Sequence, residues 1–409
     1  MGKRWNVKLL FSVLIGCFVW IVASASEDNH SQSCAGHDHH SEFNVGETAL
    51  HHISDANVFS IGPFQLPLPC ILYAPGHGWD VFISSRFQPD FVGHGDGHMA
   101  YNRYVLHGGV VRRIADDNFP SGEIPVHGFI HREEIMDGAK KDVYYACIRN
   151  EWVRLDSKST ADGGLFGGGI TSYYDFSLTK NVVSMLLMFL FLSWLFISIS
   201  RSYADRVGKA PKGAQSLFEP IIVFLRDEVA KPFLGHHWER FFPLLLSLFF
   251  FILALNLFGQ VPFLGNANVT GNLAVTMALA LVTFLVTNLN GNKHYWSHLF
   301  LAPGVPAFVK PILIPVELLG IFIKPMTLML RLFANITAGH IVMVVFVGLI
   351  FIFGKSGESL GGTAGAAVGS AILTMFMMAI ELIVAFVQAF VFTILTASYI
   401  GAATEEVHH

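Results

Sequence analysis

Long apolar segments dominate the second half of the chain, beyond a glycine-rich stretch at residues 163–169. A transmembrane helix needs about 20 mostly apolar residues to cross about 30 Å of hydrocarbon. The segments that meet this length are residues 182–199, 242–263, 271–289, 312–353 and 371–403, and the last two are the longest. The pattern therefore predicts five membrane-crossing helices.

The N-terminus has the pattern of a secretory signal peptide. Basic residues at positions 3 and 4 precede an apolar run, which ends at Ala23, Ser24 and Ala25. Such an order of charge, apolar run and small residues is typical of a cleaved signal, so we expect residues 1–25 to be removed and the following region to be exported. An uncleaved anchor is one alternative. Lipoprotein processing at Cys17 is another, which the apolar run continuing past this cysteine disfavours.

Residues 26–170 are polar and rich in turns and histidine. Short alternating runs, such as residues 81–85 and 144–148, indicate strands of a small β-rich domain. The region holds His37, His39, His40, His51, His52, His94, His98 and His107. Metal binding is one interpretation of these histidines, but no regular Cys/His ligand spacing supports it. Surface histidines behind a solvated leader are the other.

Four cysteines occur in the chain. With Cys17 inside the signal, three remain in an oxidising compartment, where disulfides persist. A disulfide between Cys70 and Cys147 would leave Cys34 as the odd thiol, but the spacing alone does not decide the pairing.

The loop between the first two apolar segments is rich in basic residues, and the positive-inside rule places it in the cytoplasm. Five crossings after an exported N-terminus then put the C-terminus in the cytoplasm too. Residues 216–233 of this loop combine an apolar stripe with charges, as expected of a helix on the membrane surface. The basic residues are Arg201, Arg206, Lys209, Lys212, Arg226, Lys231 and Arg240.

Composition agrees with this organisation. The chain has 409 residues, of which 53% are hydrophobic and 14% charged, and a net charge of -4 argues against a nucleic-acid partner. We predict an all-α polytopic membrane protein with five crossing helices, one membrane-surface helix and a small β-rich exported domain. The expected boundaries are residues 1–25 for the signal, 26–170 for the exported region and 171–409 for the membrane domain.

One arginine, Arg331, lies in the middle of the fourth apolar segment. A charged guanidinium near the bilayer centre costs from about 3 to over 10 kcal/mol, so such a residue usually marks an ion path. Glu317, Lys324 and Arg331 are spaced by seven residues and Asn335 follows four later, which aligns them in one polar stripe. No equally central acid occurs in the chain, so we expect the counter-charge of Arg331 on another subunit.

His340 and Glu381 are expected to face each other. His340 lies about 13 Å from Arg331 toward the exported side and about 180° round the helix. In the fifth segment, Glu381 aligns with Gln388 and Tyr399; if Gln388 lies at the depth of Arg331, Glu381 comes level with His340. An acid and an imidazole at one depth suit a proton relay.

Structural roles are the alternative for the other polar residues of these two segments. Glu317 and Lys324 lie close enough to the cytoplasmic interface to snorkel to it. Asn335 and Gln388 are residue types that join helices by hydrogen bonds.

The motif Leu330-Arg-Leu-Phe-Ala-Asn-Ile-Thr-Ala-Gly-His340, preceded by residues 317–329, resembles the signature of subunit a of the F-type ATP synthase. Residues 388–406 resemble the last helix of that family, and residues 268–284 and 210–232 are similar to two further family motifs. The resemblance covers residues 175–406. The exported region resembles the extension of long bacterial forms.

The resemblance implies roles for individual residues. Arg331 matches the essential arginine that faces the carboxylates of the rotating c ring, Asn335 and Gln388 match polar residues beside it, and Glu317 matches an acid on the cytoplasmic access path. The best-studied bacterial members carry Glu where this chain has His340 and His where it has Glu381, a reciprocal exchange that keeps acid and imidazole together. Ala334 replaces the usual glycine and still allows close helix approach.

The resemblance also implies the function. The chain would supply two offset proton half-channels beside the c ring, with entry past His340 and Glu381, exit toward Glu317, and Arg331 blocking a direct leak. Expected partners are the c-ring subunits, the b subunit and the lipid bilayer, in the bacterial inner membrane. No G-x-x-x-x-G-K-[ST] loop is present, so we expect no ATP chemistry here, and no cofactor.

Two other classes of protein fit the sequence less well. A secondary transporter would show internal repeats, and none is found. A metal-binding exported receptor with one anchor does not explain four further spans. The choice between H⁺ and Na⁺ as coupling ion stays open.

Overall fold

The computed structural model describes residues 54–61, 64–89, 95–116, 119–136, 139–158, 171–205, 208–261, 267–301, 306, 308–353 and 360–405. The predicted signal peptide, Cys17, Cys34 and the histidines at positions 37, 39, 40, 51, 52 and 94 lie outside these ranges. Within them, the predicted combination of a β-rich N-terminal region with a helical membrane domain is confirmed.

The β-rich region contains eleven strands among the described residues. A two-stranded hairpin precedes a nine-stranded sheet of order β4-β3-β11-β10-β7-β6-β5-β8-β9, and β9 also pairs with β10. This extra pairing closes six strands, from β10 to β9, into a barrel without free edges. The strands are β1 (Val58–Ile61), β2 (Phe64–Pro67), β3 (Pro69–Ala74), β4 (Gly78–Ile83), β5 (Met99–Tyr101), β6 (Tyr104–His107), β7 (Val110–Ile114), β8 (Glu123–Met136), β9 (Ala139–Ile148), β10 (Glu151–Lys158) and β11 (Thr171–Asp175).

The suggested pairing of Cys70 with Cys147 is wrong. Cys70, on β3, is a free buried thiol, whereas Cys147, on β9, is disulfide-bonded, so the two are not bonded to each other. Strands β11 and β10 lie between β3 and β9 in the sheet. Three inter-strand steps separate the two backbones by about 14 Å, beyond the 4.4–6.8 Å that a disulfide spans between Cα atoms.

The helical region begins directly after β11. Its helices are α3 (Lys180–Asp205), α4 (Ala214–Phe224), a π-helical segment (Leu225–Ala230), α5 (Lys231–Leu234), a short 3-10 turn (Gly235–His237), α6 (Trp238–Gly259), α7 (Leu273–Leu289), α8 (Lys293–Leu301), α9 (Lys310–Phe353) and α10 (Leu360–Thr404). Gly235 has a φ of 53°, a left-handed conformation that glycine adopts without strain, and it separates α5 from α6.

Four helices of the described residues are long and apolar enough to cross a membrane, or five if a bent pair counts as one span. The bent pair is α7 and α8, which meet at 100°. The predicted third crossing, residues 271–289, corresponds to α7. This helix has 17 residues, about 26 Å of rise, and therefore passes the length test only together with α8.

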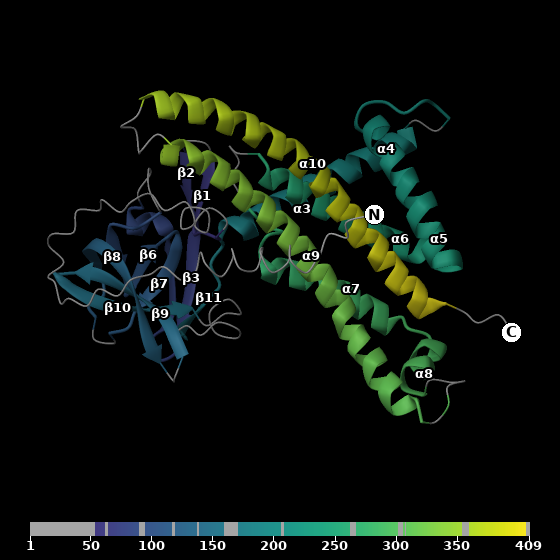
Figure 1. Cartoon of the computed structure of the whole chain (residues 1–409), viewed down its shortest axis with the longest axis horizontal. Helices are drawn as coiled ribbons and strands as arrows, with labels where there is room; N and C mark the ends of the chain where they lie inside the picture. Colours follow the sequence, from purple (N-terminus) through teal and green to yellow (C-terminus); the bar gives the residue numbers. More distant parts are fainter. Residues whose placement is uncertain are drawn as a thin grey trace, which may run out of the picture. The chain divides into compact units, whose positions relative to one another are not determined.

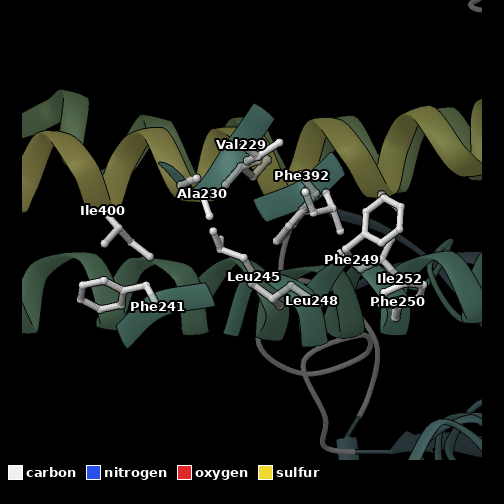
Figure 2. Close-up of a cluster of buried hydrophobic side chains, with 14 of the residues drawn as sticks. Val229, Ala230, Phe241, Leu245, Leu248, Phe249, Phe250, Ile252, Phe392 and Ile400 are labelled. Atoms are coloured by element: carbon white, nitrogen blue, oxygen red, sulfur yellow. The ribbon is translucent and has the colours of Figure 1, made fainter. Parts of the chain in front are cut away.

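Helices α9 and α10 run side by side over much of their length, and α6 packs against α10 (Figure 1). Figure 2 shows the main hydrophobic core of this region, in which Phe392 and Ile400 of α10 meet Leu245, Phe249 and other side chains of α6. Val229 and Ala230 of the π-helical segment close the same core. The core thus holds one face of α10 against α6, and Leu328, Leu332 and Ile336 of α9 join it from the neighbouring helix.

The β-rich region and the helices share a smaller core. Phe59 and Leu68 pack with Leu255 and Phe258 of α6. At the first turn of α3, the backbone N–H of Lys180 donates to the carbonyl of Ala56 at 2.8 Å. The start of the first crossing helix is therefore held by the segment that leads into β1.

Candidate functional site

Arg331 lies on a face of α9 that the described residues cover only in part. Leu328, one turn before Arg331, and Leu332, the next residue, belong to the main core, whereas Arg331 is half-buried and Asn335 is exposed. No carboxylate of the described residues forms a salt bridge with Arg331. Because a buried or membrane-embedded guanidinium without a counter-charge is costly, this geometry agrees with a partner supplied from outside the chain.

Two contacts fix the register between α9 and α10. The ammonium of Lys324 lies 5.6 Å from the ring centroid of Tyr399, and His340 pairs with Glu381. Interpolating between these contacts places Gln388 opposite residue 334, about one helical turn from Arg331. The depth assumed for Gln388 from the sequence is therefore correct to about one turn, and Gln388 is buried there.

His340 and Glu381 are neighbours, as helical pitch predicts. The Nε2 atom of His340 lies 3.7 Å from Oε1 of Glu381, and only 7% and 3% of the two side chains are exposed. Neither carboxyl oxygen of Glu381 accepts a hydrogen bond from a described residue. A Cβ atom at Gly339 would lie 3.0 Å from Oε1 of Glu381, so the glycine gives this carboxyl its room. A buried carboxyl with two unused acceptors is suited to exchanging a proton with the imidazole.

Helix α6 lines the same place with amides. Gln260 donates to the backbone carbonyl of Glu381 at 2.8 Å, and Asn256 donates to that of Ala385 at 3.2 Å. Thr270, in turn, donates to Oδ1 of Asn256 at 2.7 Å. These residues were not predicted from the sequence, although an amide inside an apolar segment was a signal that could have found them.

Lys180 adds a positive charge close to the pair. It is the first residue of α3, its side chain is buried, and it acts electrostatically on His340. Together with the amides of α6, it makes the surroundings of His340 and Glu381 polar at the end of α3 that joins the β-rich region.

Glu317 lies at the other end of α9, away from His340 and Glu381. Its Oε1 atom lies 3.5 Å from Nδ1 of His298 on α8, and its Oε2 atom is buried with no hydrogen-bond partner among the described residues. His298 was not predicted, because α8 shows no pattern in the sequence that brings it to α9. The bend between α7 and α8 makes this contact.

The polar residues of α9 thus fall into two groups with Arg331 between them. From Glu317 to Arg331 is 14 residues, or about 21 Å along the helix, and from Arg331 to His340 is 9 residues, or about 13 Å. No set of three or more potential metal-ligating side chains occurs in the part of the chain that the structure describes.

Known protein families match both the helical region and the β-rich region of this chain. The family model "ATP synthase A chain" matches residues 182–401, and the model "Domain of unknown function (DUF8433)" matches residues 48–146. A curated protein of Chloroherpeton thalassium, ATP synthase subunit a, is 41% identical over 240 residues, which cover 58% of this chain and 69% of that protein. The ATP synthase subunit a of Myxococcus xanthus is 42% identical over 260 residues, covering 62% of this chain and 81% of that protein.

The matched residues include α9 and most of α10, which carry Arg331, His340 and Glu381. The family model covers more than half of the chain, and the helices are of membrane-crossing length. The chain therefore belongs to the ATP synthase subunit a family, the multi-pass bacterial inner-membrane subunits that translocate protons in the Fo sector, couple this flow to ATP synthesis and have no catalytic activity of their own.

Proposed function

We propose that this chain forms two offset proton half-channels beside the c ring, separated by Arg331. The observation that carries the proposal is the position of Arg331 on α9, without a carboxylate partner among the described residues and between a buried acid–imidazole pair and a second acid. An embedded cation that no described carboxylate neutralises calls for a carboxylate on a neighbouring subunit.

On the exported side, His340 and Glu381 pass protons toward the ring. The carboxyl of Glu381 takes a proton from the imidazole at 3.7 Å, and Gln260 and Asn256 hold the α10 backbone around it. A ring carboxylate that receives this proton becomes neutral and can leave Arg331 for the lipid, because a neutral acid no longer carries the cost of a charge in hydrocarbon.

On the cytoplasmic side, Glu317 receives the proton that a returning ring carboxylate gives up near Arg331. Attraction by the guanidinium favours the ionised form of that carboxylate, so the proton is released. Asn335 and Gln388 supply polar groups beside Arg331 along this route. A proton wire running directly past Arg331 is disfavoured, because the excess positive charge on the wire is repelled by the fixed cation.

Topology follows from the same assignment. We place the signal peptide at residues 1–25, the exported region at 26–170 and the membrane domain at 171–409, with the C-terminus in the cytoplasm. The basic loop between α3 and α6 supports this orientation through the positive-inside rule. The c ring and the b subunit are the neighbours that we propose within the Fo sector.

Replacing Arg331 with alanine tests the proposal. We expect the complex to assemble and respiration-driven ATP synthesis in inverted membrane vesicles to be lost. Arg331→Lys should also perform poorly, because a point charge lacks the planar fork that binds a carboxylate. The matched control is Arg240→Ala, an exposed arginine of α6 that donates to Asn290 at 2.9 Å, which should keep synthesis near normal. Synthesis by Arg331→Ala at the level of this control would refute the proposed gate.

A further inference from the structure

The sheet formed by β3, β4 and β11 carries large apolar side chains on both faces. One face belongs to a hydrophobic core, where Cys70, Leu72 and Phe82 are buried. Side chains of a strand alternate between its two faces, so Ile71 of β3 and its partner Val81 of β4 lie on the opposite, outer face. Val81 is 69% exposed there. An antiparallel sheet with one face in the core usually turns polar residues to the other face, which this sheet does not.

The outer face consists of three rows, each with one residue from β3, one from β4 and one from β11 or the segment after it. The first row is aromatic: Tyr73 pairs with Trp79 and with Tyr174 in the sheet. Its rings are in contact, with centroids 5.1 Å apart for Tyr73 and Trp79 and 6.4 Å apart for Tyr73 and Tyr174.

The second and third rows are mostly aliphatic. In the second, Phe176 lies beside Ile71 and Val81, because its N–H donates to the carbonyl of Ile71 at 2.8 Å. In the third, the N–H of Leu178 donates to the carbonyl of Pro69 at 3.1 Å, opposite Ile83. None of the nine residues is charged. We call this surface, defined by its three rows, the outer sheet face.

The outer sheet face lies next to the start of the first crossing helix. Leu178 of the third row is two residues before Lys180, where α3 begins, which is at most about 7 Å of chain. Tyr174 of the aromatic row is six residues before it, at most about 22 Å. Farther along α3, Phe189 and Leu190 are exposed apolar side chains of the crossing helix itself.

The side-chain types of the three rows follow the change from the acyl region of a bilayer to its headgroups. Aliphatic side chains suit the acyl boundary, and tyrosine and tryptophan suit the headgroup level, where an apolar ring and a polar atom are both accommodated. On the outer sheet face, the row nearest α3 is aliphatic and the row farthest from it is entirely tyrosine and tryptophan.

We propose that the outer sheet face rests on the lipid bilayer, with its aromatic row at the headgroups of the exported leaflet. The β-rich region is then a membrane-associated domain, anchored both by its link to α3 and by this surface. The inference goes beyond the proposed proton path, but it rests on the proposed export of the N-terminal region.

The test compares two introduced cysteines, one per variant, in the full-length chain in lipid nanodiscs. Val81→Cys lies in the middle row of the outer sheet face, on the edge strand β4, and the matched control Ile135→Cys replaces an equally aliphatic residue of β8 that is 76% exposed. Both carry an environment-sensitive fluorophore. The wild-type chain, taken through the same labelling, gives the background from native cysteines; Cys70 is buried and contributes little.

We expect the probe at position 81 to emit at shorter wavelength than the probe at position 135. Lipids with a spin label near the headgroup should quench it several-fold more strongly, and aqueous iodide several-fold less. Quenching of both probes by iodide to the same degree would overturn the proposal. Protection from iodide without quenching by the labelled lipid would also overturn it, because a protein would then cover this face.

A separate measurement tests whether the N-terminal region is exported, and so distinguishes a wrong topology from a wrong assignment of the outer sheet face. In intact spheroplasts, a membrane-impermeant maleimide should label Ile135→Cys from outside. Labelling only after lysis would overturn the export on which the inference rests, whatever the probe at position 81 reports.

Discussion

Exchanging His340 and Glu381 tests the geometry of the proposed exported-side pair. The single substitution His340→Glu places two carboxyls at one depth, and Glu381→His places two imidazoles there. Each variant removes the attraction between an acid and an imidazole, and each leaves two groups of the same kind in a polar but largely water-excluded place. The double exchange restores an acid beside an imidazole, with their helices transposed.

The size of the effect follows from the 3.7 Å between Nε2 of His340 and Oε1 of Glu381. Two opposite unit charges at this distance attract by about 4 kcal/mol at an effective dielectric constant of about 20. The pair is ionised during only part of a proton transfer, so we take about half of this value, about 2 kcal/mol. Proton entry in each single variant should then be slower by roughly 30-fold.

The assay is proton uptake into membrane vesicles, followed with a pH-sensitive dye, for the wild type, both single variants and the exchange. Uptake is normalised to the amount of assembled complex purified from the same membranes. We expect proton uptake by the exchange variant to be about tenfold faster than by either single variant. The effects of two substitutions at groups in contact do not add, because the double exchange restores the interaction that each single substitution removes. An exchange no faster than the worse single variant would show that the two residues are not a functional pair.

Three further predictions concern the fold and the processing of the chain. A Cβ atom at Gly401 would lie 2.0 Å from the backbone carbonyl oxygen of Phe233, so Gly401→Ala should lower the free energy of unfolding by about 1–3 kcal/mol and lower the thermal midpoint in detergent. The control Gly369→Ala, whose added Cβ would have nothing within 4 Å, should leave the midpoint unchanged. Equal midpoints for the two variants would contradict this contact. Burial, with the negative charge of Asp175, raises the pKa of the Cys70 thiol to about 12. Cys70 should therefore resist alkylation in the native protein as the pH rises past 9, where an unfolded thiol ionises. Mass spectrometry after treatment with iodoacetamide measures this, and rapid labelling of the native protein would refute it. N-terminal sequencing should find a mature chain beginning at or near Ser26, and an intact Met1 would indicate an uncleaved anchor.

Helical pitch made the depth of the polar residues predictable from the sequence. In a membrane, crossing helices run roughly along one direction, so the rise of 1.5 Å per residue converts spacing into depth. This is why His340 and Glu381 could be placed at one level and why the level of Gln388 was correct to about one turn. The position of Arg331 near the centre of its segment followed from the same count. The alternation at residues 81–85 and 144–148 likewise indicated strands: β4 contains residues 81–83 and β9 contains residues 144–148, whereas residues 84 and 85 begin a 3-10 helix.

Lateral neighbours depended on packing and were settled only by the tertiary structure. The contact of His298 with Glu317 needs the bend between α7 and α8, and the amides of α6 reach Glu381 only because α6 packs along α10. The cysteine pairing failed for the same reason, since the number of strands between β3 and β9 is a property of the sheet order. Spacing along one chain segment determines depth and face, whereas the partner across an interface is chosen by how whole elements fill space together.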